Sequence, residues 1–311
     1  MNIMNYIVTT TIFPPSKALK KFETLKNWKL IVVGDKKTPH ELYEKNNNII
    51  YLNPEYQEKN YKNLSDLIGW NCIQRRNIGY IEAFKRGASI ISSIDDDNIP
   101  LDNWGSELFL NNTIDCKVYS PLNKKINVWD PFSATNYPMY WHRGYPINLI
   151  KEKNKVNYNI STSKLIDIQA DFWNGDPDID AIERLIYTPD CTFDDSLFPF
   201  TGSVMAPFNS QNTFFTRDSM KDFFLFPYVG RMDDIWGSFY AQAKGRNVLY
   251  NKATVIQERN EHDYLIDFSK EVNGYLNNEK IINDILIDAE NISKYIPDIS
   301  YSAFKEYKKY F

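Results

Sequence analysis

Short apolar runs alternate with stretches of helical periodicity over the N-terminal third of the chain. Mainly β-branched or apolar runs at 6–10 (YIVTT), 30–33 (LIVV) and 49–52 (IIYL) are typical of buried strands. An amphipathic stretch at 16–26, with Ser16 as its N-cap, follows the first run. This alternation predicts an α/β protein whose parallel sheet is covered by helices on both faces.

A second helical stretch precedes a fourth strand. Between residues 74 and 86 apolar side chains recur at helical spacing, and the run 89–94 (SIISSI) then predicts a strand. The middle of the chain, 101–216, is rich in loops, and helical spacing returns after it. The chain has no internal repeat and no low-complexity linker. We therefore predict one domain, residues 1–262, followed by a helical C-terminal extension, residues 263–311.

Polar residues stand where the predicted strands end. They are Thr9, Thr10, Asp35, Asp95, Asp96 and Asp97. Ligands of open α/β sheets bind beyond the carboxyl ends of the strands, so these side chains are expected near one site. Consecutive carboxylates repel each other unless a cation or solvent screens them. Their oxygens suit Mg²⁺ or Mn²⁺, which bridges protein to diphosphate, although an acidic solvated turn is the alternative.

Further candidates for ligand binding lie in short polar motifs. Arg75 and Arg76 open the predicted helix, where backbone N–H groups also favour phosphate, but both could be solvated arginines. The segment 174–180 (NGDPDID) has more carboxylates than a turn requires. The segment 209–212 (NSQN) suits sugar hydroxyls or an Asx-rich loop. At 231–236 (RMDDIW) an acid near an indole could act as a general base, or begin a helix with an acidic first turn.

Histidine is scarce, and several common catalytic motifs are missing from the sequence. His262 follows the strand-like run 254–257 and could return to the metal, although a lone histidine is more often structural. The chain contains neither a P-loop, nor GxGxxG, nor GxSxG. P-loop ATP hydrolysis, Rossmann dinucleotide use and serine-hydrolase chemistry therefore lose support.

Composition and charge narrow the class of partner. The hydrophobic fraction is 43%, which is enough for a sizeable core. The chain has 36 basic and 40 acidic residues, which gives a net charge of −4. No basic stripe is present, so the chain is not expected to bind nucleic acid. The cysteines are three, widely spaced and without a CxxC, which favours a reducing compartment. We see no signal peptide and no apolar run of roughly 18 residues, so a cytoplasmic protein without a transmembrane segment is expected.

Several segments together resemble nucleotide-sugar enzymes of the GT-A type. Residues 75–97 resemble the helix, strand and DXD metal motif of those enzymes. The segments 13–39, 174–185, 209–215, 234–242 and 257–268 resemble the STELLO-type glycosyltransferase-like family. The triple Asp and the segments 143–149 (RGYPINL), 176–181 and 230–236 resemble the reversibly glycosylated polypeptides, which are UDP-arabinopyranose mutases. The STELLO-like segments are longer and match more closely, from about Thr9 to Phe268. Plant STELLO proteins are membrane-anchored in the Golgi, in contrast to the pattern here.

The resemblance implies a fold and an activity. The fold would be GT-A-like, with a mixed, mostly parallel sheet flanked by helices and a helical C-terminal extension. The activity would be metal-dependent transfer of a sugar from a nucleotide-diphosphate donor, with a UDP-sugar favoured, to a glycan or small acceptor. The alternative is a nucleotide-sugar mutase that exchanges pyranose and furanose rings, with Arg143 as transient sugar carrier. A homo-oligomer is compatible with either activity.

The resemblance also implies roles for individual residues. The ligands of Mn²⁺ or Mg²⁺ would be Asp95, Asp97 and His262. Nucleotide contacts would come from Thr9, Thr10, Asp35, Arg75, Arg76, Asn77 and Asp96. The sugar or acceptor would be bound by Asn174, Asp176, Asp178, Asn209, Gln211, Arg231 and Trp236. The catalytic residues would be Asp234, Asp233 and Arg143, with Asp234 as base toward an acceptor hydroxyl.

Overall fold

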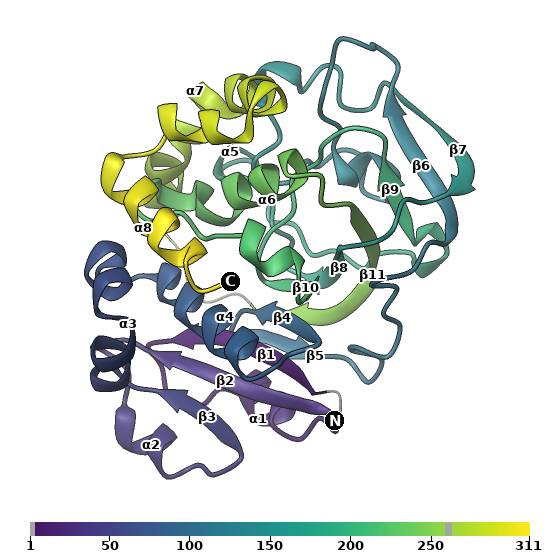
Figure 1. Cartoon of the computed structure of the whole chain (residues 1–311). Coiled ribbons are helices and arrows are strands. Elements are labelled where there is room, and N and C mark those ends of the chain that lie inside the picture. The colour runs from purple at the N-terminus through teal and green to yellow at the C-terminus, as the bar shows by residue number, and fades with distance from the viewer. Residues whose placement is uncertain (1–3, 259–262) are drawn as a thin grey trace.

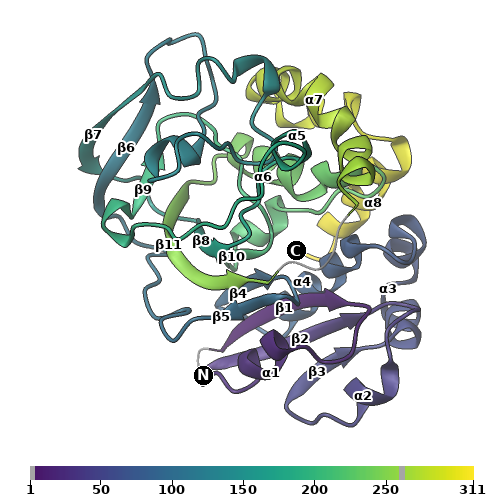
Figure 2. The same cartoon turned by 180° about the vertical axis from the view of Figure 1, so that it is seen from behind.

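The computed structural model describes residues 4–258 and 263–311. In this part of the chain, eleven strands form one mixed sheet in the order β3-β2-β1-β4-β10-β8-β11-β9-β6-β7, with β5 paired to β11 (Figure 1). Helices lie against both faces of its N-terminal half and over the C-terminal half (Figures 1 and 2). The predicted mixed sheet flanked by helices is thus confirmed.

The N-terminal half of the sheet is parallel. Its strands are β1 (Asn5–Thr11), β2 (Trp28–Gly34), β3 (Ile49–Leu52) and β4 (Ile90–Ile94). Each coincides with a predicted apolar run, because strands covered by helices on both faces need apolar side chains on both. Gly79 lets a helix approach β1 and β2 closely, since a Cβ there would stand 2.4 Å from a Val8 methyl group.

The helices of this half are α1 (Lys17–Phe22), α2 (His40–Glu44), α3 (Pro54–Ile68) and α4 (Arg76–Lys85). Ser16 caps α1 as predicted, because its hydroxyl accepts a hydrogen bond of 3.1 Å from the Leu19 N–H. The predicted helix at 74–86 begins with a turn of 3-10 helix, η1 (Ile73–Arg75), and continues as α4.

The second half of the sheet mixes both strand directions. Its strands are β5 (Asn98–Pro100), β6 (Asp115–Pro121), β7 (Val156–Thr162), β8 (Ile168–Gly175), β9 (Phe200–Gly202), β10 (Asn212–Thr216) and β11 (Val248–Gln257). Antiparallel β10 joins β4 to β8, and β8 runs parallel to β11. The segment that the sequence indicated to be loop-rich therefore supplies five strands of the sheet, β6 to β10, which are separated by long connections.

Helices of the C-terminal half complete the fold. They are α5 (Ala181–Arg184), α6 (Asp233–Ala243), α7 (Tyr264–Ile287) and α8 (Asp298–Lys308), with 3-10 turns η2 (Pro131–Ala134), η3 (Ile147–Leu149), η4 (Asp195–Leu197), η5 (Ser219–Asp222), η6 (Gly230–Met232) and η7 (Ala289–Lys294). No helix within 4–258 and 263–311 has the length and apolarity needed to cross a membrane.

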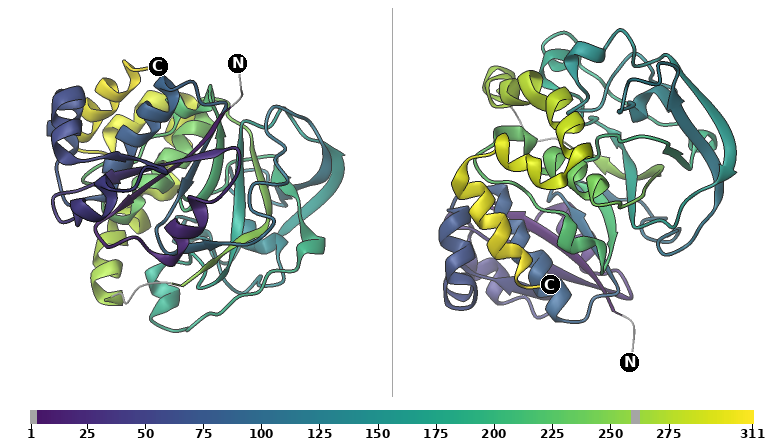
Figure 3. Two further views of the ribbon diagram at one scale, coloured as in Figure 1. Left: turned by 90° about the horizontal axis from the view of Figure 1, so that it is seen from below. Right: turned by 45° about the horizontal axis from the view of Figure 1, so that its top comes forward.

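The helical C-terminal segment packs back onto the N-terminal half. The ring of Phe311 lies 4.6 Å from that of Phe84 on α4, and Tyr310 contacts Tyr61 on α3 at 5.4 Å. Figure 3 shows α8 running beside the N-terminal helices. The helices expected after residue 263 are therefore present, and the end of the chain packs against α3 and α4.

Candidate functional site

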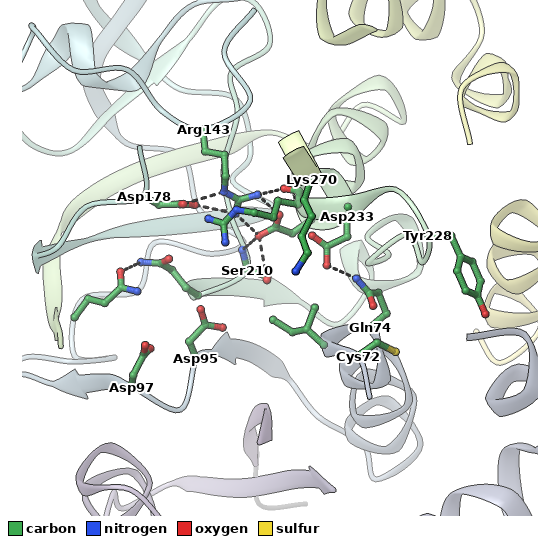
Figure 4. Close-up of a pocket in the computed structure, with 16 residues that line it drawn as sticks. Cys72, Gln74, Asp95, Asp97, Arg143, Asp178, Ser210, Tyr228, Asp233 and Lys270 are labelled. Carbon is green, nitrogen blue, oxygen red and sulfur yellow. Dashed lines mark hydrogen bonds and ion pairs between the residues drawn. The ribbon is translucent and has the colours of Figure 1, made fainter. Parts of the chain in front are cut away.

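A cleft of about 450 Å³ opens where β4 and β11 end, on the side of the sheet where a ligand site was expected (Figure 4). It is lined by Cys72, Ile73, Gln74, Asp95, Asp97, Arg143, Asp178, Ser210, Gln211, Tyr228, Gly230, Arg231, Asp233, Asp234, Gln257 and Lys270. Residues far apart in the sequence thus meet in one place, and several of them were site candidates from the sequence.

The centre of the cleft is an arginine held between two carboxylates, which we call the Arg143 cluster (Arg143, Asp178 and Asp234). Arg143 donates two hydrogen bonds of 2.9 Å to Asp178 and two of 3.0 and 3.1 Å to Asp234. It also donates to the Arg231 carbonyl. All three cluster side chains are buried, so the two carboxylates are stabilised by the shared guanidinium and by protein hydrogen bonds rather than by water.

Surrounding segments hold this cluster in place. Asn209 donates to Asp178 at 2.9 Å, and the Ser210 N–H donates to Asp234 at 3.0 Å. Burial by itself lowers the pKa of Arg143, but the charges of Asp178 and Asp234 outweigh it and raise that pKa well above its usual value. Arg143 is therefore a permanently charged centre of the cleft.

The neighbouring carboxylate of Asp233, unlike that of Asp234, is not paired with Arg143. It accepts a hydrogen bond of 2.7 Å from Gln74, and no arginine is within ion-pair distance of it among the described residues. Burial, followed by repulsion from Asp234, raises the pKa of Asp233 to about 7. A carboxyl group with this pKa, lining a cleft, can exchange a proton near neutral pH.

The acidic triplet (Asp95, Asp96 and Asp97) lies at one side of the cleft. Asp95 forms an ion pair of 2.6 Å with the buried Arg76. Asp96 points away from the cleft and accepts a hydrogen bond from the Thr11 hydroxyl. Asp95 and Asp97 line the cleft, and Figure 4 shows their carboxylates next to each other.

The donor atoms at this side of the cleft suit a hard divalent cation, because carboxylate oxygens are the preferred ligands of Mg²⁺ and Mn²⁺. Within the described residues no group of three His, Cys, Asp or Glu side chains is arranged to hold a metal ion. The third predicted ligand, His262, lies outside the described residues. Asp95 and Asp97 are thus the described side chains that fit the predicted metal.

Three predicted nucleotide contacts are corrected by the structure. The Arg75 guanidinium is fully buried and donates to Gln57, Ser65 and the Gly69 carbonyl. Arg76 is buried behind the triplet. Asn77 is buried and pairs with both backbone groups of Leu225. The reason is the same in each case: the first turn of α4 packs into the interior, so its polar side chains bond to protein rather than to a ligand.

The other nucleotide candidates lie near the cleft without lining it. Thr9 is buried on β1, and Thr10 follows it on the same strand. Asp35 accepts hydrogen bonds from the N–H groups of Lys36 (2.6 Å) and Cys72 (3.0 Å). Because Cys72 lines the cleft, Asp35 connects the end of β2 to the cleft wall.

Of the residues predicted to bind the sugar or acceptor, some line the cleft and others do not. Asp178, Gln211 and Arg231 line the cleft, and Asn209 supports Asp178 from behind. Asn174 accepts from the Phe193 N–H, and Asp176 pairs with Arg184 at 2.6 Å. Neither residue lines the cleft. Trp236 is wrongly predicted, because its fully buried ring faces α7 and donates to Asn278 at 2.8 Å.

Sequence reasoning missed the part of the site that comes from α7. Lys270 is exposed, lines the cleft and has no ion-pair partner among the described residues. Glu271 is fully buried and accepts from Arg231 (2.7 Å) and from the Ala181 N–H (2.9 Å). It therefore joins η6 to α5. In the sequence, Lys270 and Glu271 are two adjacent charged residues in a predicted amphipathic helix. Such residues usually lie on a solvent-exposed face, so the sequence did not indicate a site here.

The chain was compared with protein-family models, with curated proteins and with solved structures. No protein-family model matches the chain. Two curated Arabidopsis thaliana proteins are similar, each at 25% identity: probable glycosyltransferase STELLO2 over 94% of this chain and 40% of that protein, and probable glycosyltransferase STELLO1 over 68% and 29%. The chain thus spans less than half the length of these relatives.

Among solved structures, glucosyl-3-phosphoglycerate synthase from Mycobacterium tuberculosis in complex with phosphoglyceric acid covers 96% of this chain and 82% of its own. The TM-score is 0.45 and the identity 10%, which is too low to indicate a shared function. The resemblance that the motifs indicated is confirmed: over most of its length, this chain is similar to the STELLO-type glycosyltransferases.

Proposed function

We propose that the chain is a metal-dependent glycosyltransferase that uses a nucleotide-diphosphate sugar, with a UDP-sugar as the favoured donor. The observation that carries the proposal is the cleft itself, which unites Asp95 and Asp97 with Asp233 and the Arg143 cluster. The names of the similar plant proteins support the same class of reaction.

The donor diphosphate belongs at the side of the cleft lined by Asp95 and Asp97. A divalent cation bound there would neutralise the departing diphosphate. The cleft is otherwise rich in carboxylates, and both of its arginines are paired with acids. Lys270 is the cation in the described cleft that remains for the diphosphate, so we assign it to the leaving group.

The acceptor hydroxyl requires a base, and Asp233 fits that role better than Asp234. Each Asp234 oxygen accepts at least two hydrogen bonds, from donors that include Arg143 and Ser210, so this carboxylate is held as a charge partner. Asp233 has the raised pKa, and its hydrogen bond from Gln74 orients it. We therefore assign proton removal to Asp233 and positioning to Asp234.

The mutase alternative needs Arg143 as a nucleophile. A guanidinium nitrogen attacks only after losing a proton, and the two carboxylates raise the pKa of Arg143 well above its usual value. Its nitrogens already donate to Asp178, Asp234 and the Arg231 carbonyl. These contacts favour a transferase in which Arg143 orients the carboxylates around the donor sugar.

Incubation of the purified protein with labelled UDP-sugars, with Mn²⁺ or with EDTA, tests this proposal. With water as the acceptor, we expect release of nucleoside diphosphate and free sugar with Mn²⁺ and not with EDTA, and Asp97→Ala should abolish the release. A ring-isomerised nucleotide sugar formed without any acceptor would instead establish the mutase. Turnover that is unchanged by EDTA would contradict the metal assignment.

A further inference from the structure

We propose that Tyr228 is the stacking platform of an acceptor subsite, and that the acceptor presents the apolar face of a sugar ring to it. This inference rests on the proposed function and adds the chemical class of the acceptor to it. It is carried by the exposure, the backbone conformation and the place of this tyrosine in the cleft.

Tyr228 is an exposed aromatic in a polar cleft. Its side chain is 52% exposed, and Ile73, which also lines the cleft, is 40% exposed. Apolar surface left in water at a binding cleft is informative, because most of the cleft is lined by charged and amide groups. A sugar ring needs this combination, since it has an apolar C–H face and polar hydroxyl edges.

The backbone presents this ring at the expense of local strain. Tyr228 has φ of +66°, a left-handed conformation that is unfavourable for a bulky residue. Its hydroxyl donates a hydrogen bond of 3.1 Å to the Leu67 carbonyl at the end of α3. Gly230, two residues on, has φ of +70°, and a Cβ there would stand 2.1 Å from the Lys270 carbonyl. Gly230 adopts its conformation without strain, so Tyr228 is the strained residue of the two, and such a residue in a cleft points to a function for its conformation.

Position along the cleft assigns the ring to the acceptor rather than to the donor. In Figure 4 Asp95 and Asp97 lie on one side and Tyr228 on the opposite side, with Asp233 and Gln74 between them. If Asp95 and Asp97 bind the donor diphosphate and Asp233 removes the acceptor proton, a group beyond Asp233 contacts the acceptor. Thr9, Thr10 and Asp35, the predicted nucleoside contacts, line no part of the cleft, and Asp35 reaches its wall through the Cys72 N–H, so the UDP affinity of Tyr228 variants separates an acceptor contact from a nucleoside contact.

Saturation-transfer NMR on the protein loaded with UDP and Mn²⁺ tests the proposal. The probes are the methyl β-glycosides of glucose, galactose and xylose and methyl α-mannoside, and UDP affinity is measured separately by calorimetry. We expect at least one glycoside to receive saturation at its ring C–H protons. Tyr228→Ala should weaken that binding about tenfold, while UDP affinity stays within about twofold.

Two variants separate binding from folding. Tyr228→Gly removes both the ring and the backbone strain, so it should lose glycoside binding without loss of thermal stability. Tyr228→Phe keeps the ring and should keep the binding. Tyr158→Ala is the matched control, because Tyr158 is 54% exposed on β7 and does not line the cleft.

Three results would overturn the subsite: no probe glycoside binds the loaded wild-type protein, glycoside binding survives in both the Ala and the Gly variant, or UDP affinity falls together with glycoside binding. The last result would place the nucleobase, rather than the acceptor, on the ring. Failure of UDP itself to bind with Mn²⁺ would instead count against the proposed function, so the two failures are distinguishable.

Discussion

The acidic triplet and the Arg143 cluster line the same cleft, but the chain assembles them in different ways. The triplet is contiguous, follows one strand and is partly exposed, with Arg76 as the ion-pair partner of Asp95. The Arg143 cluster unites residues that are 35 and 91 positions apart, and its side chains are almost fully buried at the base of the cleft. In the triplet, Asp95 and Asp97 line the cleft and are partly exposed, whereas in the cluster one guanidinium is held between two buried carboxylates.

This difference decides what a substitution can report. Removing one partner from a buried ion pair leaves an uncompensated charge, so it destabilises the fold as well as altering the site. Removing a carboxylate that faces a cleft mainly changes ligand binding. The triplet should therefore separate function from stability, and the cluster should not.

The largest effect is expected from Arg143→Ala. Asp178 and Asp234 would remain buried without their cation, at a cost of about 3–5 kcal/mol in the free energy of unfolding. Urea denaturation followed by circular dichroism measures this cost. A triple variant that adds Asp178→Asn and Asp234→Asn to Arg143→Ala should recover part of the loss, and no recovery would contradict the view that the ion pairs stabilise this region.

Asp233→Asn should lower turnover by about a hundredfold or more without a comparable loss of stability, because an amide cannot accept the proton. The measurement is kcat for glycosyl transfer, with donor affinity determined in parallel. Asp234→Asn is the informative comparison, since it should also destabilise the fold by weakening the bonds to Arg143. Equal turnover by Asp233→Asn and the wild type would show that Asp233 is not the general base.

The pH dependence of the reaction sharpens the same assignment. Burial raises the pKa of Asp233 to about 7, and a base acts only when deprotonated. We therefore expect kcat/KM to fall about tenfold per pH unit below pH 7 and to level off above it. This acidic limb should be absent from UDP binding measured over the same range, provided that binding does not involve Asp233.

Asp95 combines the properties of the two regions, because it lines the cleft and also forms an ion pair with the buried Arg76. Asp95→Ala should lower the free energy of unfolding by about 2 kcal/mol, since Arg76 is buried while the Asp95 side chain is 27% exposed. Asp97→Ala should abolish turnover at nearly unchanged stability. Thermal melting of both variants makes the comparison, and equal melting temperatures would show that Arg76 does not depend on Asp95.

The smallest effect is expected from Lys270→Met, which should weaken UDP binding about tenfold at low salt and less at high salt. Calorimetry at two salt concentrations measures it. Lys280→Met is the matched control, because Lys280 is exposed on the same helix and does not line the cleft. A similar loss in both variants would mean that the overall charge, rather than a contact, is responsible.

The sequence by itself determined the parallel half of the fold and the place of the triplet. Apolar β-branched runs predict strands because burial on both faces is a local requirement, and the chain order puts residues 95–97 at the end of β4. The N-cap of α1 at Ser16 could likewise be predicted from the sequence, because capping involves residues only three positions apart.

Only the tertiary structure decided which polar side chains line the cleft and which are internal partners. Arg75, Arg76, Asn77 and Trp236 have the residue types of a binding site, yet they are buried among partners from other segments. Lys270 and Tyr228, by contrast, reach the cleft from segments whose local patterns are unremarkable. The reason is physical: the free energy of a polar group depends on what surrounds it, and those neighbours come from parts of the chain that no local pattern connects.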